Sequence, residues 1–191
     1  QELLSLYDKT CGWADILMAQ QWIEGSDANL YSCNCYYDAN STALVTFIAR
    51  KLRQWPPETG TSCMGEEVRN DAVLLASTAL FESVNYQGLG YVEMKKDDLT
   101  GHHYIIEPNI GRPTGRSAIT EAGGVELVYT AYCDMLGLPL PPNREQMYHG
   151  VKWISLRRDF QSALYYWWRG DITLEEWRES WRGSKGYAIY D

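Results

Sequence analysis

The sequence lacks a long apolar run and a leader-like start. Across its 191 residues, no stretch approaches the roughly 20 consecutive apolar residues that a membrane-spanning helix needs. No basic segment followed by an apolar one opens the chain. The five cysteines are an odd number without the spacing of a disulfide framework, which favours a reducing compartment. We therefore expect no transmembrane segment and a cytoplasmic location.

Internal repeats, low-complexity tracts and an excess of basic residues are also missing. The chain holds 25 Asp and Glu against 17 Lys and Arg, which gives a net charge of −8. Residues 1–143 carry the whole acidic excess, because 144–191 are nearly balanced. This charge argues against nucleic acid as a partner. We expect one main domain over 1–143 and a helical tail over 144–191, packed on that domain or on a partner.

The most informative residues present are acids on two predicted neighbouring strands, 88–96 and 103–109. Side chains alternate along a strand, so Glu107 and Asn109 point the same way. Glu93 stands on the partner strand, at a position where it could face them. Two carboxylates and an amide oxygen on one sheet face suit a hard cation such as Mg²⁺. The pattern therefore predicts a magnesium site.

A loop rich in glycine and arginine, residues 111–117, follows the second strand. It contains Arg112 and Arg116, so cations stand beside the predicted metal site. The loop could be a degenerate P-loop, but it has three residues between its glycines where that motif has four, and arginine where lysine is required. The simplest alternative to a metal site is a solvated sheet face whose acids pair with Lys95 or His103.

This arrangement resembles the C-terminal half of the ATP-grasp superfamily, the ATP-dependent carboxylate–amine ligases related to biotin carboxylase. There, a Glu on one strand and a Glu-x-Asn with an Arg on the next hold Mg²⁺ and the phosphates of ATP. The resemblance assigns metal binding to Glu93, Glu107 and Asn109. It assigns the catalytic arginine to Arg112 or Arg116, since glycine occupies the family's usual arginine position.

Residues 18–25, with the sequence MAQQWIEG, resemble the superfamily's adenine hinge. In such hinges the backbone binds the adenine edge, so shape counts more than side-chain identity. The resemblance implies ATP contacts from Gln20, Gln21, Trp22 and Ile23. The stretch 49–57 is similar to a basic segment in an uncharacterised branch of these ligases, as is the tail 152–187. Within that stretch, Lys51 and Arg53 are most simply a charged strand end, but as two cations on one face they could meet a phosphate or a substrate carboxylate.

The resemblance implies a ligase that uses ATP and Mg²⁺ to join a small carboxylate to an amine. ATP would phosphorylate the carboxylate, and the amine would displace phosphate from the acyl phosphate to form an amide. The chain opens just before the hinge, whereas the family's glycine-rich lid and phosphate-holding lysines precede it. We therefore expect a C-terminal lobe that is inactive alone and that binds ATP no more tightly than millimolar.

Periodicity and turn residues predict an α+β fold, with a mainly antiparallel sheet flanked by helices. Strands are expected over 16–23, 29–37, 42–50, 88–96 and 103–109, with a loop over 54–66. Helices are expected over 2–10, 71–82, 121–136, 153–169 and 173–183. The last begins with a capping-box pattern from Thr173 to Glu176.

Two other functional classes remain open. A non-catalytic lobe would bind nucleotide weakly, or would mainly assemble with a partner chain. A carbohydrate-binding module is suggested by 8 Trp and 14 Tyr in an acidic chain, although most of them fall on core positions of helices or strands. The aromatic run 165–168 predicts docking on the sheet or a homodimer through the C-terminal helices. Cys33 and Cys35 lack further metal ligands and indicate core thiols.

Overall fold

The computed structural model describes residues 2–13, 16–111, 115–183 and 185–188. Its strands are β1 (Leu30–Tyr37), β2 (Ala43–Trp55), β3 (Thr61–Glu67), β4 (Gly88–Lys96), β5 (His103–Ile110), β6 (Lys152–Ser155) and β7 (Lys185–Ala188). Its helices are α1 (Glu2–Thr10), the short 3₁₀ turn Asp27–Asn29, α2 (Asp71–Ser83), α3 (Arg116–Ala122), α4 (Leu127–Met135), α5 (Leu156–Arg169) and α6 (Leu174–Ser180). The predicted α+β fold is confirmed.

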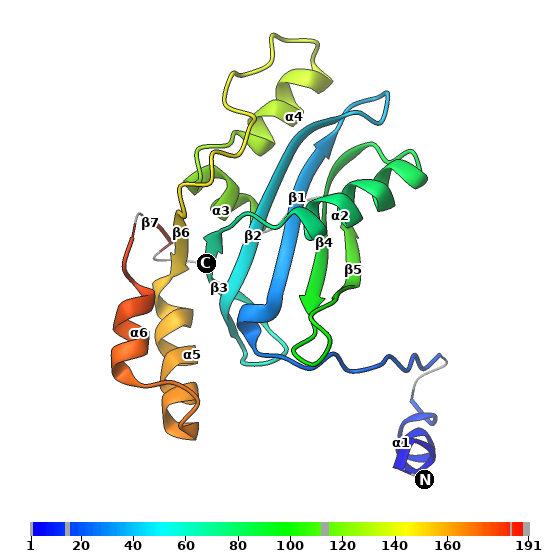
Figure 1. The fold of residues 1–191 in the computed structure, drawn as a ribbon. Coiled ribbons are helices and arrows are strands. Elements are labelled where there is room, and N and C mark those ends of the chain that lie inside the picture. Colours follow the sequence, from blue (N-terminus) through cyan, green and yellow to red (C-terminus); the bar gives the residue numbers. More distant parts are fainter. Residues whose placement is uncertain (1, 14–15, 112–114, 184, 189–191) are drawn as a thin grey trace.

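The strands form a seven-stranded sheet in the order β5-β4-β1-β2-β3-β6-β7 (Figure 1). Neighbours are antiparallel from β5 through β6, and β7 runs parallel to β6. The mainly antiparallel sheet expected from the sequence is therefore present. β6 and β7 come from the tail beyond residue 144. Because β6 pairs with β3 and β7 pairs with β6, the tail extends the same sheet.

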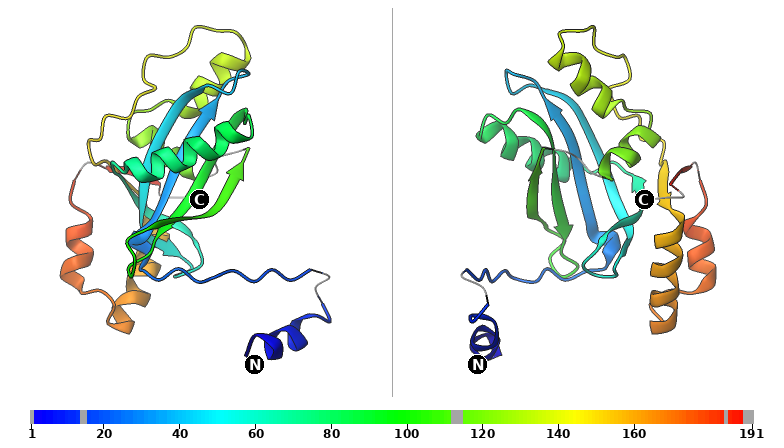
Figure 2. Two further views of the ribbon diagram at one scale, coloured as in Figure 1. Left: turned by 45° about the vertical axis from the view of Figure 1, so that its right-hand side comes forward. Right: turned by 180° about the vertical axis from the view of Figure 1, so that it is seen from behind.

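Helices cover both faces of the sheet, and the alternation of β2 shows how. Ile48 packs with Val73 and Phe81 of α2 on one face. The preceding residue, Phe47, packs with Ile119 of α3 and Leu127 of α4 on the other. Two successive side chains thus enter two different cores, as the period of a strand requires. Figure 2 shows α5 and α6 at the end of the sheet that β6 and β7 form, and α1 standing apart from the sheet.

The strand expected over 16–23 is wrong. Residues 16–24 join no strand ladder and run past the turn between β4 and β5 (Figure 1). Their apolar side chains, which suggested a strand, are largely exposed, with Ile16 at 89% and Met18 at 81%. The segment is tied to that turn by a hydrogen bond from the Asp98 N–H to the Glu24 carbonyl, at 3.2 Å. The hinge-like residues are therefore positioned by a loop contact.

Two further boundaries differ from expectation. The loop predicted over 54–66 is only a turn, because β2 continues to Trp55 and β3 begins at Thr61. The single helix predicted over 121–136 is two helices, separated at Gly123 and Gly124. Gly124 has a φ of +82°, which ends a helix readily. A Cβ on Gly123 would lie 2.5 Å from the Phe47 ring, so only glycine lets the chain approach the sheet there.

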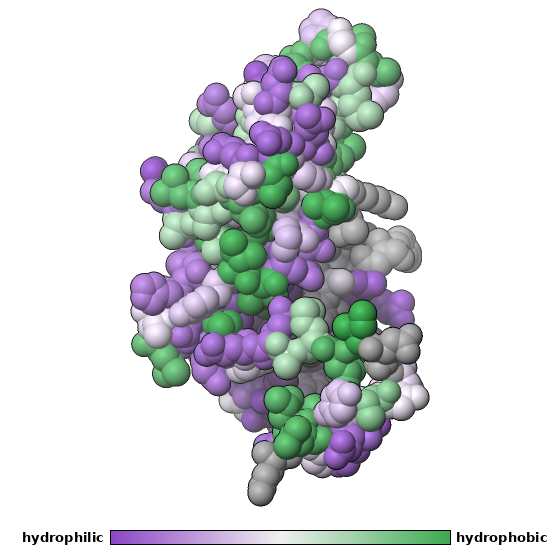
Figure 3. Space-filling model, turned by 90° about the vertical axis from the view of Figure 1, so that its right-hand side faces the viewer, coloured by the Kyte–Doolittle hydropathy of each residue, from purple (hydrophilic) through white to green (hydrophobic). Residues whose placement is uncertain are grey.

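The helix expected over 153–169 begins later, because residues 152–155 pair with β3 as β6 before α5 starts. Among the described residues no helix is long and apolar enough to cross a bilayer. From the β5 side, hydrophobic and hydrophilic side chains are mixed over the surface (Figure 3). The exposed apolar side chains of that edge strand include Ile105, Ile106 and Ile110.

The predicted capping box of α6 is present and gives a stability prediction. Thr173 Oγ1 accepts a hydrogen bond from the Glu176 N–H at 3.1 Å, and the Glu176 carboxylate accepts one from the Thr173 N–H at 2.7 Å. We expect Thr173→Ala to lower the free energy of unfolding by about 1 kcal/mol. Urea unfolding of Thr173→Ser, which keeps the hydroxyl, is the matched control. Equal losses in both variants would contradict a capping role.

Candidate functional site

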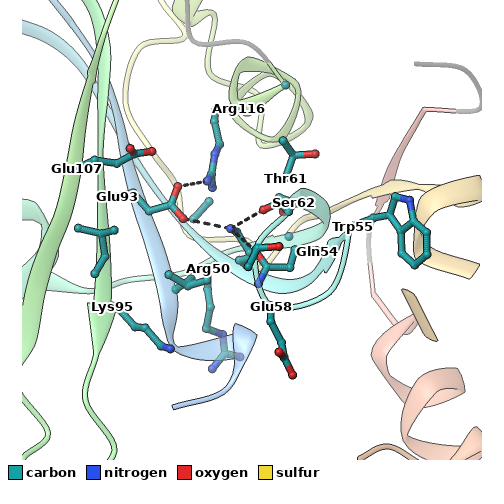
Figure 4. A pocket seen from close by; sticks show the side chains of 18 of the residues that line it. Arg50, Gln54, Trp55, Glu58, Thr61, Ser62, Glu93, Lys95, Glu107 and Arg116 are labelled. Carbon is teal, nitrogen blue, oxygen red and sulfur yellow. Dashed lines mark hydrogen bonds and ion pairs between the residues drawn. The ribbon is translucent and has the colours of Figure 1, made fainter. Parts of the chain in front are cut away.

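A large cavity lies on the α3-bearing face of the sheet. Its volume is about 1640 Å³, above the range of roughly 300–1,000 Å³ that is usual for small-molecule sites. The hinge-like segment, β2 to β5, the start of α3, β6 and the start of α5 all contribute to its walls. Figure 4 shows part of this lining, with Glu93 and Glu107 on neighbouring strands and Arg116 reaching toward Glu93.

Glu93 stands at the centre of an ion-pair network on the cavity floor. Its Oε1 lies 3.1 Å from Lys51 Nζ, and its Oε2 lies 2.5 Å from Arg116 Nη2. The exposed fractions of the three side chains are 12%, 3% and 13% for Glu93, Lys51 and Arg116. One carboxylate therefore compensates two poorly hydrated cations, and each of its oxygens has a partner.

The network also fixes the positions of its two cations. Lys51 Nζ donates to Gln54 Oε1 at 2.9 Å as well as to Glu93. Burial lowers the pKa of the Lys51 ammonium, and the Glu93 carboxylate opposes that shift. The Arg116 guanidinium lies 5.1 Å from the centre of the Tyr91 ring, a cation–π distance. The Arg116 guanidinium is thus held in place by the Tyr91 ring and by the Glu93 carboxylate.

The strand register places the predicted acids on one face. Glu93 of β4 pairs directly with Glu107 of β5, and Tyr91 pairs with Asn109. Residues paired across strands face the same side, so the predicted juxtaposition of Glu93, Glu107 and Asn109 is present. Asn109 Nδ2 donates to Glu107 Oε1 at 3.0 Å. Unlike Glu93, Glu107 has no cationic partner within the ranges that the structure describes.

The hinge-like residues line the same cavity, although they are not a strand. They are Gln20, Gln21, Trp22 and Ile23. The Trp22 ring lies 4.6 Å from Lys95 Nζ, which fixes this segment against β4. Tyr104, Ile105 and Ile106 of β5 line the cavity as well and add apolar surface.

Among the described residues, one of the named cations, Arg53, does not line the cavity. Arg53 is buried on the α5 side, where its Nε lies 2.7 Å from Asp159 Oδ1 and its Nη1 lies 3.0 Å from Ser180 Oγ. Because two register shifts fall between Lys51 and Gln54, the two cations do not share a face as the sequence suggested. Arg112 lies outside the described residues. Of the two arginines that the resemblance assigned, Arg116 is the one that the structure describes, and it lines the cavity.

Sequence reasoning missed the contribution of α5. Arg157, Arg158 and Gln161 line the cavity from this helix, and Trp153 does so from β6. The spacing of Arg157 and Gln161, four residues apart on one helix flank, was the available signal. With them, the cavity has six basic residues and three acidic ones, in a chain with a net charge of −8.

No protein-family model matches the sequence, and no curated protein sequence matches it. Solved structures do match the fold. The N5-carboxyaminoimidazole synthetase of Staphylococcus aureus, complexed with ADP, is 15% identical over 67% of this chain and 34% of its own, with a TM-score of 0.52. The biotin carboxylase domain of a single-chain bacterial carboxylase is 19% identical over 75% of this chain and 33% of its own, with a TM-score of 0.50.

Pyruvate carboxylase of Rhizobium etli is 18% identical over 63% of this chain and 12% of its own, with a TM-score of 0.51. The chain thus spans about a third or less of the length of these proteins. At such identities the likeness is one of fold. The chain has the fold of the C-terminal lobe of ATP-grasp proteins, as its motifs predicted.

Proposed function

We propose that this chain is the C-terminal part of an ATP-dependent carboxylate–amine ligase that works through an acyl phosphate. One observation carries the proposal: the hinge-like residues 20–23 meet Lys51, Glu93, Glu107 and Arg116 in one cavity. The ATP-grasp lobe fold supports it, as does the ADP in the S. aureus structure. The acid and the amine are small molecules, for which a deep cavity is the appropriate shape.

The hinge would hold the adenine ring. The backbone of residues 20–23 makes no hydrogen bond to other backbone groups of the described chain, so its N–H and C=O groups are open to the edge of a purine. Ile105, Ile106 and Tyr104 offer apolar surface for the ring. The phosphates would then extend along the floor toward Lys51 and Arg116.

Magnesium fits the donors at Glu107. This carboxylate is exposed and has no competing cation within the described ranges, and the side-chain carbonyl of Asn109 is adjacent once the amide turns. The described residues hold no group of three or more His, Cys, Asp or Glu that could bind a metal by themselves. Mg²⁺ tolerates this, since it commonly takes one or two carboxylates beside phosphate and water. When bound, it would neutralise charge on the phosphates.

Glu93 would act differently from the role that its motif suggests. Both of its oxygens are engaged by Lys51 and Arg116, so it would position these cations rather than bind metal directly. This assignment leaves Glu107 and Asn109 as the metal ligands of the lobe.

In the proposed reaction, an oxygen of the substrate carboxylate attacks the terminal phosphorus of ATP, and ADP leaves. Nitrogen of the amine then attacks the acyl carbon, phosphate leaves and the amine loses a proton. The Arg116 guanidinium would hold the transferring phosphoryl group or the acyl phosphate by charge-assisted hydrogen bonds. No nucleophilic side chain is required, because positioning and charge stabilisation carry such transfers.

Three broader expectations accompany the proposal. The domain division at residues 143 and 144 stays a prediction. A cytoplasmic location agrees with five free cysteines, of which four are buried. A homodimer through the C-terminal helices would cover Phe160, Leu164 and Trp168 of α5, whose exposed fractions are 56%, 52% and 80%.

The proposal gives a binding prediction for Glu107. We expect Glu107→Ala to weaken binding of ATP with Mg²⁺ by about tenfold or more, because the site loses the carboxylate beside Asn109, which no cation of the described residues engages. Calorimetric titration measures this at millimolar nucleotide. In EDTA, wild type and variant should bind ATP equally.

The matched control is Glu82→Ala, an exposed acid of α2 on the opposite face of the sheet. This variant should bind ATP with Mg²⁺ like the wild type. Wild-type affinity in Glu107→Ala would remove Glu107 from the metal site, and the absence of any ATP binding would contradict the nucleotide site itself.

A further inference from the structure

The cavity continues past the phosphate region to a second cationic end. Arg157, Arg158 and Gln161 line that end, together with Trp55 and Trp153. The hinge residues 20–23 and Glu107 lie toward the other end of the same sheet face, beside β4 and on β5. The two ends are therefore built by different parts of the chain, and the motifs of the nucleotide site do not account for the second one.

The orientation of α5 explains why its polar residues meet the cavity. Its buried residues, Asp159, Ser162 and Ala163, form the face that packs on the sheet. With 3.6 residues per turn, Arg158 lies one turn before Ser162 and so falls on the flank beside that face. Arg158 Nη1 donates to Thr61 Oγ1 at 3.0 Å, which brings this flank to the start of β3. Arg158 is thus placed at the cavity wall by the packing of the helix, and Arg157, the residue before it, lines the cavity from the more exposed side of α5.

Charge distinguishes the two ends of α5. At its C-terminal end, Arg169 pairs with Glu58 at 2.5 Å and with Asp171 at 3.0 Å. At its start, Arg157 has no acidic partner among the residues that the structure describes. An arginine that lines a cavity without an acid is available to bind an anion. Its planar guanidinium matches a carboxylate in a two-pronged geometry.

Gly65 lies between the second cationic end of the cavity and Lys51 of the proposed phosphate region. Lys51 of β2 pairs with Gly65 of β3, and Gly65 pairs with Trp153 of β6. The three residues form a row across one sheet face, and the middle one has no side chain. A Cβ there would lie 3.3 Å from the Arg50 carbonyl oxygen and 3.5 Å from Ser62 Oγ. No side chain therefore projects from the sheet at Gly65, and a ligand can extend over this position between Lys51 and Trp153.

We propose that the α5 end of the cavity binds a substrate carboxylate that does not react. Arg157 and Arg158 would hold this carboxylate, and the Trp153 ring would contact the apolar part next to it. The inference rests on the proposed ligase function and specifies one of its substrates: a molecule that carries a carboxylate besides its reacting group. Amine substrates such as amino acids and short peptides have this chemistry, and so do dicarboxylic acids.

Titration with matched acid and amide probes tests the proposal. Glycylglycine and glycylglycinamide differ only in the terminal carboxylate, and glutarate and glutaramide provide the dicarboxylic pair. With the full 191-residue chain, we expect at least one acid to bind about tenfold more tightly than its amide. Whichever pair shows the preference identifies the source of the carboxylate. If both acids bind no better than their amides, the proposal is wrong.

Three variants locate the binding. Arg157→Ala combined with Arg158→Ala should reduce the preference to about twofold or less, whereas Arg182→Ala, at an exposed tail arginine paired with Glu179, should keep it. Gly65→Val should also abolish acid binding, by filling the floor without changing charge. Circular dichroism establishes that each variant is folded. An undiminished preference in the folded double-arginine variant or in folded Gly65→Val would overturn the proposal.

ATP binding in the same samples separates this inference from the proposed function. The double-arginine variant should bind ATP with Mg²⁺ as the wild type does, because α5 lies at the other end of the cavity. A preserved acid preference in a chain that binds no ATP would contradict the nucleotide site and leave the carboxylate subsite standing. ATP binding without any acid preference would contradict the carboxylate subsite and leave the nucleotide site standing.

Discussion

Replacing Asp159 with alanine is expected to lower the free energy of unfolding by about 3–5 kcal/mol. Asp159 is completely buried, and its Oδ1 lies 2.7 Å from Arg53. Its Oδ2 accepts hydrogen bonds from the indole N–H groups of Trp177 and Trp181, each at 3.1 Å. Without the carboxylate, Arg53 stays buried with a side-chain exposure of 7% and no counter-charge. Urea unfolding measures the loss.

The same residue joins α6 to the rest of the fold, because Trp177 belongs to α6 and Trp181 follows it. We therefore expect Asp159→Ala to change tryptophan fluorescence before the main unfolding transition. Asp159→Asn keeps hydrogen-bonding oxygen but not the charge, so its loss should be intermediate. The control is Asp171→Ala, which breaks an exposed pair with Arg169 and should cost less than about 1 kcal/mol. Equal losses for the two alanine variants would contradict the assigned role.

This network also shows why Arg53 was misassigned from sequence. Two cations two residues apart on a strand share a face only if the strand is regular. The register shifts after Lys51 break that regularity, so one cation enters the cavity and the other enters the α5 network. A bulge depends on the partner strand as well as on its own residues, and β3 itself was predicted as a loop.

Local patterns predicted the central hairpins and most helices well. The turn and alternation between β4 and β5 were sufficient to place Glu93 opposite Glu107, because both strands and their turn are contiguous in sequence. The capping box of α6 was equally legible. What these features share is that all the interacting residues lie within about twenty positions of each other.

Features that depend on distant segments were not predictable in this way. β6 looked like the first turn of a helix, and only its pairing with β3, over eighty residues earlier, makes it a strand. The hinge-like segment looked like a strand, but no neighbouring strand offers it a ladder. The cavity residues of α5 were missed for the same reason, because they reach the cavity only when the C-terminal tail packs on the sheet.

The second large effect is expected at Glu93. Glu93→Ala should lower the free energy of unfolding by about 3 kcal/mol, because Lys51 and Arg116 then remain close together with little access to water and no acid between them. The measurement is urea unfolding in EDTA without nucleotide, so that no metal or phosphate can replace the missing charge. Arg116 should also lose its fixed position, which would weaken ATP binding.

A double variant tests whether Glu93 acts by compensating Lys51. Lys51→Met removes the more buried of the two cations that pair with Glu93 and keeps an unbranched apolar chain in its place. In the background of Glu93→Ala it should restore stability, so the double variant should lose less than the sum of the single losses by about 1–3 kcal/mol. The assignment of Glu93 as a metal ligand, which its motif alone suggests, predicts no such coupling when metal is absent.

The two roles therefore give opposite results in one experiment. If Glu93 positions the cations, the losses are strongly non-additive in EDTA, and Glu93→Gln is milder than Glu93→Ala because the amide oxygen still accepts one hydrogen bond. If Glu93 binds metal directly, the losses add in EDTA and the variant differs from the wild type mainly when Mg²⁺ is present. Additive losses would indicate that Glu93 is a metal ligand. They would then contradict the assignment of Glu107 and Asn109 as the only metal ligands among the described residues.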